Sequence, residues 1–150
     1  MEAYKIAVPD VSVLIQLAQT GELETLLLHH THTPWLVTDM VHWGITQGKT
    51  QAPMSTVLLE LYDAMRYRFE VYPTTIGKLV NDLDLQQWDN RLAELSVLAF
   101  INSLKHTTLH DKMVVVLDEG WVQDHVIKTP PWIRWVGAQR LTTFLDSAPF

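Results

Sequence analysis

Apolar runs alternate with amphipathic segments along most of this chain. Apolar and β-branched residues predict strands at 4–8, 34–40, 69–73, 112–120 and 130–137. Apolar residues at helical spacing predict a helix from Ser12 to the stop at Gly21. Further helical segments are predicted at 21–30, 40–49 (as helix or turn), 53–68, 74–89 (with a polar connection), 90–105, 121–127 and 138–147. This alternation favours an α/β fold around a mainly parallel sheet.

Composition narrows the class of protein. The chain has 150 residues, with no repeat, low-complexity tract or linker, so a single domain over residues 1–150 is expected. It contains no cysteine, which excludes disulfides and thiolate–zinc sites and agrees with a reducing cytoplasm. We expect no signal peptide and no membrane span, because no run approaches about 18 apolar residues.

The net charge is −6 with histidines neutral. A module that binds nucleic acid through phosphate contacts alone is usually basic, so the acidic balance argues against that class. It leaves room for an acidic metal site, because a bound divalent cation reverses the local field.

Acidic residues follow several of the predicted strands. Asp10 follows the first, Asp39 stands near the end of the second, and Asp118 and Glu119 end the apolar run before 120. In parallel sheets, functional groups gather beyond the carboxyl ends of the strands. We therefore expect these side chains to lie near one another.

Glu94 is the fifth acid of interest. We expect it in the first turn of the helix at 90–105, where the helix dipole favours an anion. Carboxylates brought together repel one another unless cations intervene, and a cluster of oxygen ligands is typical of Mg²⁺ or Mn²⁺. The sequence places these acids at strand ends; that they meet is a hypothesis.

Simpler roles exist for each acid. Asp10 and Asp39 are suited to helix N-caps, and Asp118–Glu119 to a helix start. Glu94 could be a solvated acid on a helix surface, and Ser12 a local cap. A cap and a metal ligand are compatible roles for one aspartate.

Four blocks resemble the PIN-domain ribonucleases, which include the VapC-like toxins. DVSVLIQLAQTGELETLL has the opening Asp, a Ser two residues later and a hydrophobic helix. WLVTDMVHWGI resembles the second block, RLAELSVLAFI the third with Glu94 as its acid, and VVVLDEGWVQD the fourth with Asp118 and Glu119. Together, and in the right order, they cover nearly the whole chain.

The resemblance implies a three-layer α/β/α fold and a metal-dependent endoribonuclease, the toxin of a toxin–antitoxin pair. Asp10, Glu94 and Asp118 would be catalytic and would hold Mg²⁺ or Mn²⁺, with Glu119 or Asp39 completing the ligand set. Ser12 would orient Asp10 or a water. The implied partners are an RNA substrate and an antitoxin protein. One side of the helix at 53–68 could face a second copy in a homodimer or the antitoxin, although its default interpretation is a role in the core.

The chain departs from the family pattern at its second acid. Gly44 stands at that position, and glycine has no side chain to ligate a metal. Where relatives often carry Arg after the fourth block, this chain has Gln123 and Asp124. The alternative is therefore a catalytically degenerate PIN-like domain that acts as a protein-interaction module. A phosphatase-like metal hydrolase is a weaker third reading, because Val11 and Ser12 follow Asp10 without a second aspartate. Candidate contacts to the RNA backbone are Lys49, Lys112 and Arg91.

Overall fold

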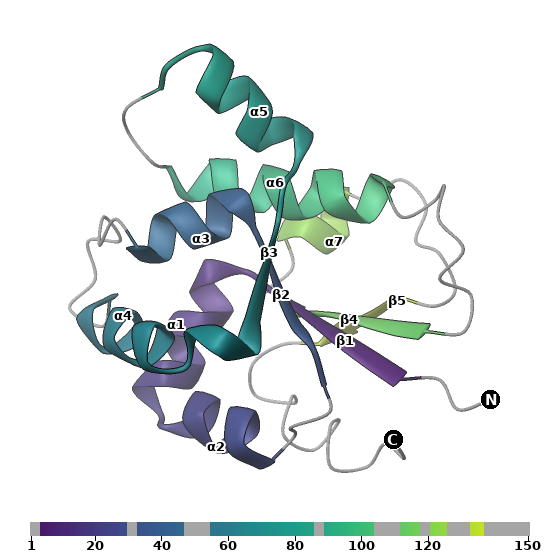
Figure 1. The fold of residues 1–150 in the computed structure, drawn as a ribbon. Helices are drawn as coiled ribbons and strands as arrows, with labels where there is room; N and C mark the ends of the chain where they lie inside the picture. The colour runs from purple at the N-terminus through teal and green to yellow at the C-terminus, as the bar shows by residue number, and fades with distance from the viewer. Residues whose placement is uncertain are drawn as a thin grey trace.

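A parallel sheet forms the centre of the computed structural model (Figure 1). The structure describes residues 4–29, 33–46, 55–85, 89–103, 112–117, 121–125 and 133–136. The strands are β1 (Tyr4–Pro9), β2 (Trp35–Thr38), β3 (Phe69–Tyr72), β4 (Lys112–Leu117) and β5 (Ile133–Val136). The prediction of an α/β fold with a parallel sheet is confirmed.

The order of the strands places β1 in the middle of the sheet. The five-stranded sheet runs β3-β2-β1-β4-β5, and every strand pair is parallel. From β1 the chain builds outward through β2 to β3, then crosses back to add β4 and β5 on the other side. The point of reversal lies between β1 and β4. In open α/β sheets a crevice for ligands forms at such a point, beyond the carboxyl ends of the strands.

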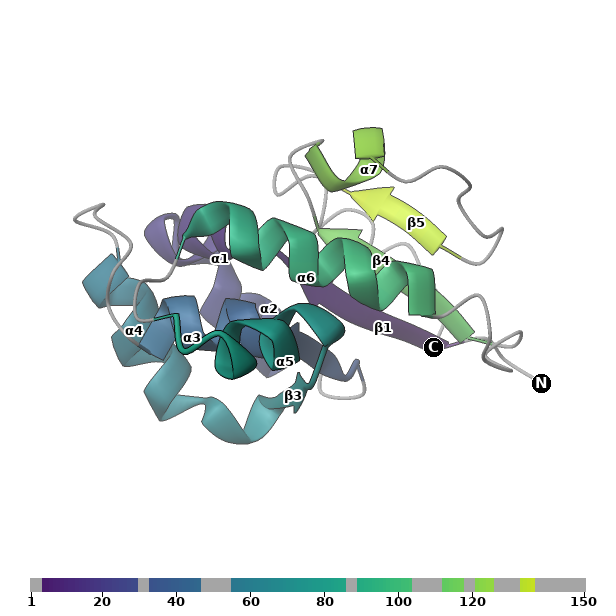
Figure 2. The ribbon, with the colours of Figure 1, turned by 90° about the horizontal axis from the view of Figure 1, so that it is seen from above.

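Helices fill the connections between the strands. Their bounds are α1 (Val11–Gln19), α2 (Glu22–His29), α3 (Asp39–Thr46), α4 (Ser55–Ala64), η1 (Arg66–Arg68, a 3₁₀ turn), α5 (Thr75–Asp82), α6 (Asn90–Ser103) and α7 (Trp121–His125). Helix α6 packs against α3, α5 and α7, whereas α1 packs against α2 and α4. Figure 1 shows α6 and α7 above the strands and α2 below them, and Figure 2 shows α6 running along the sheet beside α5. Helices therefore lie on both sides of the sheet.

The core forms where the inner faces of these helices meet the sheet. Ala7 and Val8 of β1 are fully buried, as are Val13 and Leu14 of α1. Such a strand, buried on both faces, reads as a continuous apolar run, which is why the segment at 4–8 was recognisable from sequence. Burial of this strand fixes the position of the residue that follows it, Asp10.

Several predicted boundaries were wrong. The strand expected at 34–40 ends at Thr38, and Asp39 begins α3. The helix expected at 53–68 ends at Ala64. The segment expected at 74–89 is helical only to Asp82, and Asp84 beyond it has a positive φ of 52°. The helix predicted at 138–147 lies outside the described residues.

None of the helices in the described part of the chain has the length and the apolar character needed to cross a bilayer.

Candidate functional site

Asp10 sits at the carboxyl end of the central strand. It is 2% exposed, and its side chain accepts a hydrogen bond from the Ser12 hydroxyl at 2.9 Å. Its backbone carbonyl accepts the first helical bond, from Leu14 N at 3.1 Å, but its carboxylate makes no capping bond to α1. Asp10 thus occupies the N-cap position, while its carboxylate serves something other than the cap.

Glu94 lies in the second turn of α6, not in the first turn as predicted. Asp89 precedes the helix: its Oδ1 accepts the Arg91 N–H at 2.6 Å, and its carbonyl accepts Leu92 N–H at 2.9 Å. The helix begins at Asn90, as the sequence indicated, but its first turn contains no acid, because Glu94 is its fifth residue. The dipole argument belongs to Asp89, because the effect fades beyond the first turn.

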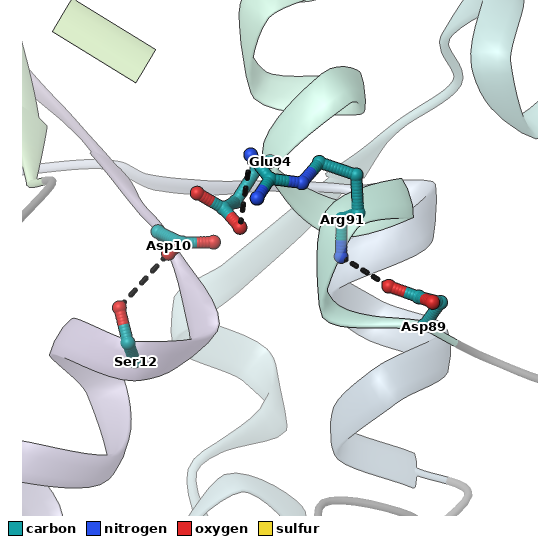
Figure 3. A network of polar contacts seen from close by, with 5 residues as sticks. All are labelled: Asp10, Ser12, Asp89, Arg91 and Glu94. Carbon is teal, nitrogen blue, oxygen red and sulfur yellow. Dashed lines mark hydrogen bonds and ion pairs between the residues drawn. The ribbon is translucent and has the colours of Figure 1, made fainter. Parts of the chain in front are cut away.

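Glu94 and Asp10 come together although they are far apart in sequence. Glu94 is 8% exposed, and Figure 3 shows its carboxylate and that of Asp10 turned toward one another. One comes from the end of β1 and the other from the crossover helix that leads to β4. Two carboxylates that face one another out of water favour a cation between them. This convergence is the chemical feature of the site.

Arg91 is a cation already present at this pair. Its Nη1 lies 3.9 Å from Oε1 of Glu94, at a spacing of three residues along α6 (Figure 3). The Arg91 side chain is 52% exposed and that of Glu94 11% exposed. The guanidinium therefore approaches the buried carboxylate from the solvent side.

A buried hydroxyl pair fastens α6 to the sheet next to Glu94. Thr38, the last residue of β2, and Ser96 of α6 place their hydroxyl oxygens 2.6 Å apart. The Ser96 hydroxyl donates to the carbonyl of Ala93 at 2.6 Å, which leaves the Thr38 hydroxyl to donate to Ser96. Both residues are fully buried. This contact holds the helix that carries Glu94 in register with the strand ends.

Asp39 is engaged elsewhere. Its Oδ1 accepts the Thr74 hydroxyl at 2.7 Å and its Oδ2 accepts the Thr74 N–H at 3.0 Å. Thr74 follows β3, on the opposite side of β2 from β1. Its hydroxyl in turn caps α5 by accepting the Gly77 N–H at 3.2 Å. Asp39 joins the ends of β2 and β3, and the structure does not bring it to Asp10 and Glu94.

Asp118 and Glu119 lie outside the described residues. The preceding residue, Leu117, ends β4 in register with Pro9, which precedes Asp10. Lys49 is also outside the described part. Lys112 begins β4 and pairs with Tyr4, at the end of the strand remote from Pro9, and its contact with RNA stays a prediction. Gly44 is buried in α3.

A cavity of about 290 Å³ lies apart from the acids. Its lining comes from Thr33–Trp35, at the start of β2, and from Tyr67–Glu70, at the start of β3. These are the amino ends of the two strands, opposite to the end that carries Asp10. The acid pair and this cavity are therefore separate features.

A second polar pair, which the sequence did not reveal, links α3 to α4. His42 Nδ1 lies 2.7 Å from the Tyr62 hydroxyl. Burial, aided by the positive charge of Arg66, lowers the pKa of His42 below its usual 6.5. Burial raises the pKa of Tyr62 to about 12. Both rings are therefore neutral near pH 7, and their bond stabilises the helix pair.

Within the described ranges, no group of three or more His, Asp or Glu side chains is arranged to hold a metal ion. Asp10 and Glu94 supply two carboxylates, and further ligands would have to come from outside those ranges or from water. Comparison of the chain with protein-family models, with characterised proteins and with solved structures gives no match.

Proposed function

We propose that this protein is a PIN-like, metal-dependent endoribonuclease, as its four sequence blocks imply. The observation that carries the proposal is the convergence of two buried carboxylates, Asp10 and Glu94, beyond the carboxyl end of the central strand. At that place the order in which strands are added to the sheet reverses, and open α/β sheets bind ligands there.

Asp118 is the proposed third acid, with Glu119 as a further ligand. Support comes from the register of the sheet: Pro9 pairs with Leu117, so the next residue along each strand is an aspartate. The described parts of β1 and β4 therefore end side by side, and Asp10 and Asp118 are the residues that follow them in the sequence. In this proposal Asp39 has a structural role, since its carboxylate already binds Thr74.

The donor set fits Mg²⁺ or Mn²⁺. All of the proposed ligands are carboxylate oxygens, which these ions prefer, and the chain has no thiolate to attract softer metals. Asp10 and Glu94 would hold the ion together with Asp118. Such an ion polarises a phosphoryl oxygen and lowers the pKa of a water molecule.

The remaining roles belong to residues around the pair. Ser12 donates to Oδ2 of Asp10 and so keeps that carboxylate in one orientation. The Thr38–Ser96 contact positions α6, and thereby Glu94, over the strand end. Within the proposal, the protein is the toxin of a toxin–antitoxin pair and acts in the cytoplasm, with RNA as substrate and an antitoxin as protein partner.

The direct test is cleavage of end-labelled RNA by purified protein with and without Mn²⁺. We expect cleavage only with the metal, and a loss of at least about 100-fold on Asp10→Asn or Glu94→Gln, the scale seen when a group that stabilises transition-state charge is removed. Asp39→Asn is the matched control, because it removes a carboxylate outside the pair. An inert wild-type protein, or an active Asp10→Asn variant, would refute the nuclease.

A second candidate function is that of a protein-interaction module, and an apolar surface on α5 favours it. Leu79 and Leu83 are 54% and 61% exposed, and Leu85 beyond the helix is 45% exposed. A spacing of four residues puts Leu79 and Leu83 on one helix face. For a module, Leu83→Lys would abolish complex formation while Asp10→Asn would leave it intact. For a nuclease, Asp10→Asn would abolish RNA cleavage while Leu83→Lys would leave it intact.

A further inference from the structure

The guanidinium of Arg91 and the proposed cation would lie next to the same carboxylates. The guanidinium reaches Glu94 from the solvent side, and Figure 3 shows it beside the space toward which the carboxylates of Glu94 and Asp10 turn. A divalent ion bound by those carboxylates and a guanidinium at the same place would repel one another.

The ion pair between Arg91 and Glu94 can be broken without moving the backbone. At 3.9 Å it is at the long end of ion-pair distances, and the Arg91 side chain is half exposed. Because the guanidinium is in contact with water, moving it aside costs only its attraction to Glu94, which an incoming cation replaces. The backbone of Arg91 is fixed by its N–H bond to Asp89. The long side chain can therefore swing aside without disturbing α6.

We propose that Arg91 is a built-in competitor for the cation site: it neutralises the Asp10–Glu94 pair when no metal is bound and must leave when the metal enters. This inference rests on the proposed function, because it needs the pair to bind a divalent cation. It adds a regulatory property, namely that the chain sets its own metal affinity below the value that the carboxylates alone would give.

The test is Mn²⁺ binding to the full chain, measured by calorimetry, for wild type and Arg91→Gln. Removing the competing charge should tighten Mn²⁺ binding about tenfold, because the ion no longer has to displace the guanidinium from Glu94. Arg91→Lys keeps the charge and should stay within about threefold of wild type. Lys78→Gln removes an equal charge from the exposed surface of α5 and should change nothing.

Thermal unfolding gives a second readout. Without metal, Arg91→Gln should unfold at a lower temperature than wild type, because the pair loses its counter-ion. With saturating Mn²⁺ the difference should shrink or reverse.

Equal or weaker Mn²⁺ binding in Arg91→Gln, with wild type binding well, would overturn the inference and leave the metal site standing. If neither wild type nor Arg91→Gln binds Mn²⁺, the proposed metal site itself fails, and this inference fails with it.

Discussion

The carboxylate of Asp39 lies so close to Gly77 that no side chain fits at position 77. A Cβ at residue 77 would stand 1.7 Å from Oδ2 of Asp39. That carboxylate is fixed by its bonds to Thr74, so it cannot simply move aside.

We predict that Gly77→Ala lowers the free energy of unfolding by about 2 kcal/mol, as overpacking of a well-filled site does. Urea denaturation measures the change. Thr75→Ala, at an exposed position of the same helix, should cost less than about 0.5 kcal/mol. In an Asp39→Ala background the Gly77→Ala loss should shrink, since the obstructing group is gone. A Gly77→Ala protein as stable as Thr75→Ala would contradict this reading.

Asp10 and Asp39 also show which parts of the site could be predicted from the sequence and which could not. Each is an acid between an apolar strand and a helix, and both were candidates for the metal. They differ because Thr74, 35 positions further along the chain, donates a hydrogen bond to the carboxylate of Asp39. No local pattern reveals that partner. Arg91 was a candidate contact for RNA, and its ion pair with Glu94 could also have been predicted, since Arg and Glu three residues apart on a helix are neighbours.

A histidine whose pKa is lowered links α3 to α4. His42 lies within hydrogen-bond distance of Tyr62, and the pKa of His42 is lowered mainly by burial. The unfolded chain therefore takes up a proton at a higher pH than the folded one. The contribution of His42 to stability is complete above its unfolded pKa of about 6.5 and is lost as the pH falls through the lowered, folded value.

We accordingly predict that the free energy of unfolding of wild type falls between pH 7.5 and pH 5 more steeply than that of His42→Gln. Urea titrations at several pH values measure both slopes. His29→Gln, which changes an exposed histidine on α2, should keep the wild-type slope. Parallel profiles for wild type and His42→Gln would show that this histidine does not carry the effect.

Element types were predictable from apolar periodicity, whereas several ends were not. The helix predicted at 53–68 stops at Ala64, and the arginines beyond it bond to backbone carbonyls both nearby and in another segment. Arg68 donates to the backbone carbonyls of Leu27 and Thr33, and Arg66 donates to that of Phe69 at 2.7 Å. Both arginines belong to η1, the 3₁₀ turn between α4 and β3. Periodicity in one segment cannot anticipate acceptors supplied by another.

At the scale of the whole molecule, the order of the strands is what brings Glu94 next to Asp10. Alternating strands and helices predicted a parallel sheet, but not the order β3-β2-β1-β4-β5. That order puts β1 beside β4 and sends α6 across the sheet between β3 and β4. Glu94 reaches Asp10 because of this crossover. The proposed nuclease therefore requires that the Asp10–Glu94 pair form a divalent-cation site.

Mn²⁺ titration by calorimetry tests that claim most directly, using wild type, Asp10→Asn, Glu94→Gln and Asp39→Asn, each checked for folding by circular dichroism. We predict saturable binding to wild type and to Asp39→Asn, and a loss of at least about tenfold in affinity in both variants of the pair. A wild-type protein that takes up no Mn²⁺, or folded Asp10→Asn and Glu94→Gln proteins that bind it as wild type does, would contradict the account.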